Sequence, residues 1–152
     1  MVIGIGNRFR CDDGLGPAVA ERAGASVRPG VRVVPEVTEC AALLEAWAGA
    51  SLAVVVDAAV GGRPGRVRRW SLDELTGPVV LSSHDLDLQQ TFELGRALGC
   101  APEKVVVVTV GAVRTGHGEG LSPAVVAALP EAVRLVETVL AEHAQETADQ
   151  VS

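Results

Sequence analysis

The sequence predicts an α/β fold in which helices cover both faces of a mainly parallel sheet. Strand and helix signals alternate along the chain, as they do in consecutive βαβ units. The run Leu52–Val56 is wholly apolar, which is typical of a central strand buried on both faces. With 152 residues, 48% of them hydrophobic, the chain is long enough to bury a real core. We therefore expect a single domain over residues 1–152.

The first half of the chain contains two predicted strands and two predicted helices. The apolar segment Val2–Ile5 predicts the first strand, and a helix over about Pro17–Ala25 follows it. Pro17 fits the first helical turn because its missing N–H would have no partner there. A second strand is predicted at Val31–Val34, and the apolar face of Ala41–Trp47 predicts a short helix.

The second half continues the alternation after the central strand, which is predicted to stop at Asp57. Arg66–Trp70 alternates and is heavily charged, as in an edge strand protected against aggregation. A helix over about Leu86–Leu98 ends at Gly99, which suits a helix C-cap. Lys104–Val110 is the last predicted strand, and its valine run indicates that it is buried.

The last predicted helix begins at Ser122–Pro123. Its apolar residues are spaced to form one face, and they are Val125, Leu129, Val133, Val136 and Leu140. Pro130 is expected to kink or divide this helix. The sequence after about residue 143 is polar, and we expect that tail to fray.

Composition excludes several classes of protein. The net charge is -6 and the arginines form no long basic segment, which argues against a nucleic-acid binder. No apolar run approaches the roughly 20 residues of a membrane span, and no signal peptide precedes the first strand, so a cytoplasmic protein is expected. The three cysteines are far apart, which argues against a disulfide framework or a structural zinc site.

An acidic pair, a third aspartate and a histidine are predicted to meet at one edge of the sheet. Asp12 and Asp13 follow the first strand and its glycine turn, Asp57 ends the central strand, and His84 precedes a helix. Ligands bind at the carboxyl ends of strands in open α/β sheets, and the first and third strands are expected to be neighbours. Two carboxylates and one imidazole suit a divalent ion such as Ni²⁺ or Zn²⁺, with positions left open for water or substrate.

Each of these residues also has a simpler interpretation. Asp13 could cap the first helix, and Asp57 could accept hydrogen bonds from backbone N–H groups. His84 could be an ordinary loop residue. His117 and Glu119 lie in a glycine-rich loop and are expected to face solvent.

Two further motifs are weaker indications of a binding site. Gly4-x-Gly6 begins like a dinucleotide fingerprint, but Phe9 stands where the third glycine belongs and two aspartates follow. Such a site would repel a pyrophosphate. The arginines between residues 66 and 69 are most simply a solvated edge, although they could meet an acidic partner surface.

Several motifs, in this order and at these separations, resemble one enzyme family. They are Gly4-Ile5-Gly6-Asn7, Asp12-Asp13-Gly14-Leu15-Gly16-Pro17, Val54-Val55-Val56-Asp57-Ala58, Pro64-Gly65, Ser83-His84-Asp85-Leu86 and Leu121-Ser122-Pro123. The chain is similar over nearly its whole length to the hydrogenase maturation proteases. These endopeptidases remove a C-terminal extension from the large-subunit precursor of [NiFe]-hydrogenases after nickel has been inserted.

The resemblance implies a fold, a ligand set and a partner. The fold would be a three-layer α/β/α sandwich with a mainly parallel five-stranded sheet and one antiparallel edge strand at Arg66–Trp70. The metal ligands would be Asp13, Asp57 and His84. They would recognise nickel carried by the precursor, bind nickel directly, or hold another divalent ion such as zinc. The protein is expected to act as a monomer.

Two hypotheses describe the hydrolytic step that the resemblance implies. In the first, a metal-bound water attacks the scissile carbonyl while Asp12 acts as base or orients the water. In the second, Asp13 itself activates water and the protein owns no metal. N–H groups of the Gly4–Asn7 turn would steady the oxyanion, and Gly6, Asn7 and Thr38 are the expected substrate contacts. The alternative function is a non-proteolytic metal or metabolite binder on the same scaffold.

Overall fold

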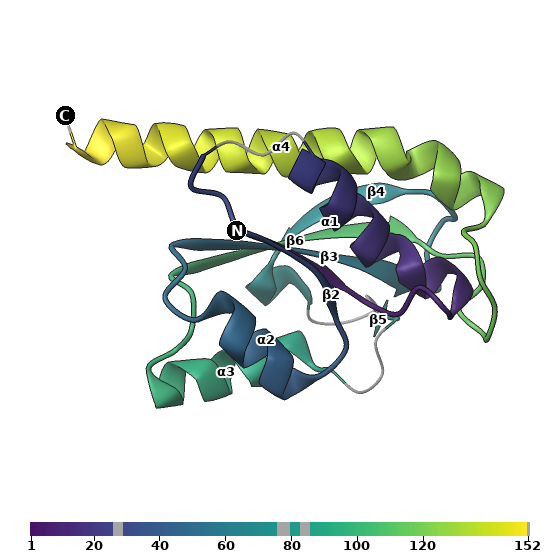
Figure 1. Cartoon of the computed structure of the whole chain (residues 1–152), viewed down its shortest axis with the longest axis horizontal. Coiled ribbons are helices and arrows are strands. Elements are labelled where there is room, and N and C mark those ends of the chain that lie inside the picture. The colour runs from purple at the N-terminus through teal and green to yellow at the C-terminus, as the bar shows by residue number, and fades with distance from the viewer. Residues whose placement is uncertain (26–28, 76–79, 83–85, 152) are drawn as a thin grey trace.

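Six strands form one mixed sheet among the residues that the structure, a computed structural model, describes: 1–25, 29–75, 80–82 and 86–151. The strand order is β2-β1-β3-β6-β4, and β5 pairs with β3 outside this path (Figure 1). The strands are β1 (Val2–Ile5), β2 (Val33–Val37), β3 (Leu52–Val60), β4 (Val67–Ser71), β5 (Val80–Leu81) and β6 (Lys104–Gly111).

The sheet confirms the predicted mainly parallel arrangement. β1 runs parallel to β2 and β3, and β3 runs parallel to β6. β4 is antiparallel to β6 at the edge of the sheet, where the charged segment Arg66–Trp70 was expected. The short strand β5 adds a second antiparallel pair that the five-stranded prediction lacks. It fits because β1 pairs with β3 only as far as Val56, which leaves Ala59 and Val60 free to pair with β5.

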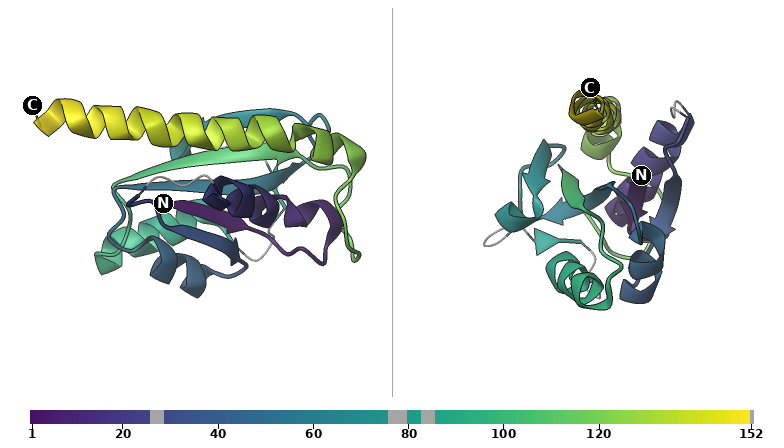
Figure 2. Two further views of the ribbon diagram at one scale, coloured as in Figure 1. Left: turned by 45° about the horizontal axis from the view of Figure 1, so that its top comes forward. Right: turned by 90° about the vertical axis from the view of Figure 1, so that its left-hand side faces the viewer.

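Helices cover both faces of the sheet, as Figure 2 shows. The first core lies under α1 (Leu15–Ala25) and α4 (Pro123–Val151), and it contains Val54, Val56 and Ala58 of β3. The second core lies under α2 (Cys40–Trp47) and α3 (Leu88–Leu98), and it contains Ala53 and Val55. Side chains alternate between faces along a strand, so Asp57 faces the α2 and α3 side. Two short 3-10 helices, η1 (Cys11–Gly14) and η2 (Leu72–Leu75), complete the elements.

Two strand boundaries differ from the sequence prediction. β3 does not stop at Asp57 but continues to Val60, because β6 runs beside it and pairs Asp57 with Thr109. β2 occupies Val33–Val37 rather than Val31–Val34. It includes Pro35, which an edge strand tolerates because one row of its backbone groups is unpaired.

The C-terminal helix is longer than predicted. α4 includes Pro130 without being divided, and it continues to Val151, past the point where the polar tail was expected to fray. Pro130 is exposed, while the predicted apolar positions Val125, Leu129 and Val136 are buried in the first core. None of the helices in the described part of the chain has the length and apolar character of a membrane span.

Candidate active site at the carboxyl edge of β1 and β3

Close packing of glycines brings the acidic segment to the carboxyl end of β1. Gly6 has a φ of +133°, and a Cβ atom there would lie 1.9 Å from the backbone oxygen of Asp13. A Cβ atom on Gly16 would lie 2.3 Å from the oxygen of Ile5 and 2.5 Å from that of Val56. Only residues without side chains permit these approaches, so η1 and the start of α1 press directly against β1 and β3.

Asp13 and Asp57 meet at one hydroxyl group. Ser82 Oγ lies 2.5 Å from Oδ1 of Asp13 and 2.9 Å from Oδ1 of Asp57. The three side chains are buried, with exposed fractions of 5%, 0% and 3% for Asp13, Asp57 and Ser82. The structure therefore brings together two of the three predicted metal ligands.

Each carboxylate is also held by a backbone donor. The N–H of Asn7 donates to Oδ2 of Asp13 at 2.9 Å, and the N–H of Ala58 donates to Oδ1 of Asp57 at 2.8 Å. Asp13 thus binds the turn that precedes it and does not cap α1. Asp57 accepts a backbone hydrogen bond, as its simpler interpretation expected, and contacts Ser82 as well.

Ser82 is a site residue that the sequence analysis missed. Its N–H donates to the backbone oxygen of Ala58 at 2.9 Å, which fixes it beside β3 directly after β5. A hydroxyl group has one proton, so it cannot donate fully to two deprotonated carboxylates at the same time. Two buried carboxylates joined in this way favour a positively charged partner, and this donor set fits a divalent cation.

The third predicted ligand, His84, lies outside the described residues, as do Ser83 and Asp85. In the described part of the chain, no group of three or more His, Cys, Asp and Glu side chains is arranged to hold a metal ion. Ser82 is the last described residue before this segment. The predicted metal role of Asp13, Asp57 and His84 stays a prediction.

Asp12 is buried away from this cluster in a different hydrogen-bond network. Its Oδ2 accepts from the N–H groups of Val113 and Arg114 at 2.8 and 2.9 Å and from Ser122 Oγ at 2.8 Å. Its Oδ1 accepts from the N–H of Ser122 at 2.7 Å. Burial alone would raise the pKa of Asp12, but the hydrogen bonds from Ser122, Arg114 and Val113 outweigh it and hold this pKa below its ordinary value.

These contacts fit a structural role for Asp12 rather than the predicted role of a base. A carboxylate that accepts four hydrogen bonds and has a lowered pKa accepts a further proton poorly. Asp12 instead fastens the loop after β6 and the start of α4 to η1. Its neighbour Asp13 is the acidic residue of the pair that faces Ser82 and Asp57.

The predicted oxyanion donors of the Gly4–Asn7 turn already have partners. The N–H of Gly6 donates to the oxygen of Val37 at 3.1 Å, and that of Asn7 donates to Asp13. Asn7 Oδ1 accepts from the N–H of Phe9 at 2.9 Å, which closes the turn. Thr38 is exposed directly after β2, next to this turn. Of the three predicted substrate contacts, Thr38 is thus the one most open to solvent.

The weaker candidates lie at the surface. His117 and Glu119 are exposed in the loop between β6 and α4, as expected.

Cys11 is buried with a φ of +51°, and its N–H donates to the oxygen of Gly118 at 2.9 Å. These contacts join η1 to the loop that contains His117.

The comparisons with known proteins identify the family. The sequence model of the HycI hydrogenase maturation protease family matches residues 20–139. The chain belongs to this family. Maturation proteases of hydrogenases are endopeptidases, so the buried acid pair belongs to a peptide-bond hydrolase. No curated protein sequence gives a significant match.

Solved structures of maturation proteases have the same fold. The hydrogenase maturating endopeptidase HybD from E. coli is 25% identical, with a TM-score of 0.77 over 93% of this chain and 91% of that chain. The [NiFe] hydrogenase maturation protease HycI from Thermococcus kodakarensis KOD1 is 26% identical, with a TM-score of 0.64 over 91% and 87%. HybD from Thermococcus kodakarensis is 21% identical and shares the fold with a TM-score of 0.70, over 91% of this chain and 96% of that chain.

Proposed function

We propose that this maturation protease removes a C-terminal extension from the precursor of a [NiFe]-hydrogenase large subunit after nickel has been inserted. The observation that best supports this function is the pair of buried carboxylates of Asp13 and Asp57, joined by Ser82, in a chain of this family. The pair lies beside the carboxyl end of β1, and α/β proteins bind their ligands at the carboxyl ends of strands.

Nickel would reach the site as part of the precursor. Asp13 and Asp57 supply the oxygen ligands, and we propose His84 as the nitrogen ligand. A divalent ion bound there lowers the pKa of a coordinated water, which is the chemistry that nickel would supply. The same ligands would accept a resident ion such as Zn²⁺, and this also stays a prediction.

Within this site, Asp13 is our proposed acceptor for the proton of the attacking water. Asp12 is saturated by donors and faces another loop, whereas Asp13 contacts Ser82 at the cluster. The Ser82 hydroxyl holds Asp13 and Asp57 in a fixed relation and can reorient its proton from one carboxylate to the other as charge changes. This arrangement favours the second of the two hydrolytic hypotheses for the base, with the metal delivered by the substrate.

The test is incubation of the purified chain with a nickel-loaded large-subunit precursor, followed by mass measurement of the large subunit. The wild-type chain is expected to shorten the precursor, and Asp13→Asn, Asp57→Asn and His84→Ala are each expected to abolish the cut. Glu119→Gln is the matched control, because Glu119 is an exposed acidic residue of a neighbouring loop. A cognate precursor left uncut by the wild-type chain would favour the non-proteolytic binder.

Monomeric state and cytoplasmic location stay predictions. Light scattering coupled to gel filtration tests the first, and fractionation of cells that express the protein tests the second. Calorimetric titration of the purified protein with Ni²⁺ distinguishes direct binding from recognition of nickel held by the precursor.

A further inference from the structure

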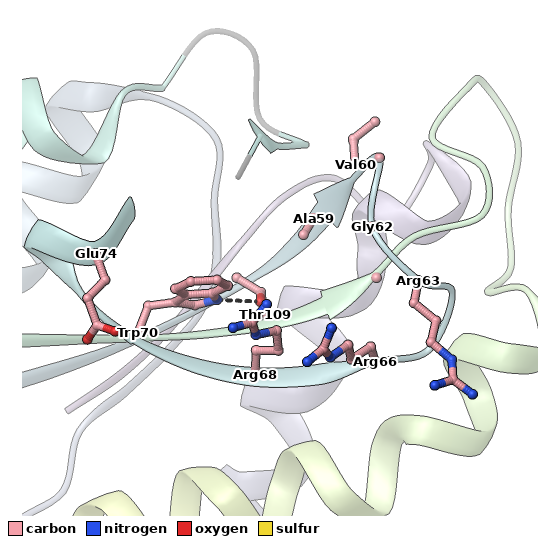
Figure 3. Close-up of a pocket in the computed structure, with 11 residues that line it drawn as sticks. Ala59, Val60, Gly62, Arg63, Arg66, Arg68, Trp70, Glu74 and Thr109 are labelled. Atoms are coloured by element: carbon pink, nitrogen blue, oxygen red, sulfur yellow. Dashed lines mark hydrogen bonds between the residues drawn. The ribbon is translucent and has the colours of Figure 1, made fainter. Parts of the chain in front are cut away.

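A basic pocket of about 300 Å³ lies on the side of the sheet where β3, β6 and the edge strand β4 meet (Figure 3). It is bordered by the end of β3, the turn that follows it and the edge strand β4. Arg66, Arg68 and Trp70 line it from β4 and the residue before it, and Thr109 lines it from β6. Figure 3 shows the guanidinium groups of Arg66 and Arg68 on the Trp70 side of the pocket, whereas that of Arg63 points away.

The strand registers connect this pocket to Asp57. Asp57 is paired with Thr109 of β6, and Thr109 is in turn paired with Arg68 of β4. Residues paired across strands project from the same face of a sheet. Asp57, Thr109 and Arg68 therefore form one row across three strands, and the pocket is a lateral continuation of the acidic site.

One of the two pocket arginines, Arg68, is held in place by an aromatic ring. Arg68 lies over the Trp70 ring at 4.1 Å from the ring centroid, and Trp70 Nε1 donates to Thr109 Oγ1 at 2.9 Å. Neither Arg66 nor Arg68 forms an ion pair within 4 Å with any described residue. Glu74 is the acidic residue of the pocket lining, and its carboxylate accepts from the N–H of Ser71 at 2.9 Å.

We propose that this pocket binds an acidic side chain of the polypeptide being cut, and this proposal rests on the function proposed above. A guanidinium group binds a carboxylate through two parallel N–H···O hydrogen bonds. A carboxylate is therefore the ligand that best fits a pocket with two arginines. The positive charge is a local exception in a chain of net charge -6. An acidic residue of the precursor is repelled by Asp13 and Asp57 and attracted by Arg66 and Arg68.

The geometry limits how far this acidic residue lies from the cut. Neighbouring strands are about 4.8 Å apart, so Arg68, two strands from Asp57, is displaced by about 10 Å along the row. An extended peptide advances about 3.3 Å per residue. For a peptide that runs along this row with its scissile bond over Asp57, the pocket would take an acidic residue about three positions from that bond.

The first experiment measures binding without cleavage. The isotope-labelled full chain is titrated with a blocked alanine-glycine peptide containing two adjacent glutamates and with the same peptide containing glutamines. The two tryptophans give two indole N–H signals, from Trp70 in the pocket and from Trp47 buried in the second core. We expect the glutamate peptide to shift the Trp70 signal saturably and to bind at least about fivefold more tightly than the glutamine peptide.

Substitutions then locate the binding. Arg66→Gln with Arg68→Gln is expected to remove the response of Trp70, and either single substitution is expected to weaken it. Arg69→Gln is the matched control, because Arg69 lies on the same strand but faces α4, where it pairs with Glu142 at 2.8 Å. Equal binding of the two peptides, or a double variant that responds like the wild type, would overturn the proposal.

The second experiment measures cleavage of the nickel-loaded precursor. The double variant is expected to raise KM about fivefold with kcat unchanged, while Arg69→Gln leaves both values unchanged. An unchanged KM in the double variant would also overturn the proposal. If the wild-type chain leaves the precursor uncut, the proposed function fails, and the peptide titration still decides whether the pocket binds carboxylates.

Discussion

Ser82 gives the acid pair its geometry at the scale of single residues. Its backbone N–H is fixed to Ala58, and its hydroxyl group reaches both Asp13 and Asp57. Neither carboxylate can turn away without losing a hydrogen bond that is shielded from water. The separation of the two acids is therefore set by a residue that has no charge of its own.

Ser82→Ala is expected to reduce precursor processing by about 10–100-fold, the usual effect of removing a group that orients metal ligands, which is the role proposed above for Asp13 and Asp57. The fold should persist, since the substitution deletes one oxygen. Mass measurement of the large subunit over time gives the rate, and Ser82→Thr, which restores a hydroxyl group, should recover part of it. Wild-type processing by Ser82→Ala would contradict the role assigned to the hydroxyl group.

Asp12→Asn is expected to lower the free energy of unfolding by about 2–4 kcal/mol at neutral pH, because an amide cannot accept the four hydrogen bonds that Asp12 receives. The pKa of Asp12 is lowered by folding, so its stabilisation is present above the unfolded value of 3.8 and is lost as pH falls through the folded value. Urea unfolding at several pH values should therefore show the two proteins converging in acid. A constant difference would contradict this.

At the scale of elements, the turn between β1 and η1 positions the acid pair. Gly6 allows η1 to touch the strand, and its N–H is paired with Val37 of β2. Through Asn7 the same turn donates to Asp13. A shift of this turn would therefore move Asp13 relative to Asp57, which is fixed separately in β3.

Gly6→Ala is expected to destabilise the fold by about 3 kcal/mol, because it combines a positive φ with a contact of 1.9 Å to backbone. Gly49→Ala separates the two causes. Gly49 also has a positive φ, of +74°, but no atom lies within 4 Å of its added Cβ, so a loss of about 1 kcal/mol is expected. Chemical unfolding of both variants tests this, and equal losses would show that the close contact costs nothing.

The elements also show what sequence patterns can and cannot predict. The approach of Asp13 to Asp57 follows from the parallel pairing of β1 with β3, which places the end of β1 beside Asp57. The role of Ser82 could not be predicted from strand patterns, because Ser82 follows a strand of two residues, which is too short to show a periodic pattern. Its signal was its position directly before the Ser83-His84 motif. β3 continues beyond the apolar run Leu52–Val56 and through the charged residue Asp57 because it pairs with β6 there. Composition alone does not show which strands pair.

At the scale of the whole molecule, the two cores lie on opposite faces of the sheet, and the acid pair shares its face with the second core. The first core is closed by α4, whose buried residues include Leu129 at 2% exposure. Asp57 faces the side of the second core, whereas the buried side chains of α4 pack in the first core. Stability and catalysis should therefore be separable by changes in α4.

Leu129→Ala is expected to lower the free energy of unfolding by about 2–5 kcal/mol through the cavity that it leaves. Val126→Ala, on the exposed side of the same helix at 48% exposure, should change it by less than about 0.5 kcal/mol. Processing by the folded fraction should be unchanged in both variants when assayed well below their melting temperatures. A fall in kcat for Leu129→Ala would show that α4 influences the site directly.

Asp57 lies inside β3 rather than at its end. Parallel pairing with β6 continues on both sides of this residue, from Leu52 to Ala59, so its backbone opens only when the centre of the sheet opens. Amide hydrogen exchange at Asp57 should accordingly be as slow as global unfolding allows. On warming, this enzyme should keep its acid pair until the whole domain melts, and its thermal inactivation should coincide with the loss of the sheet.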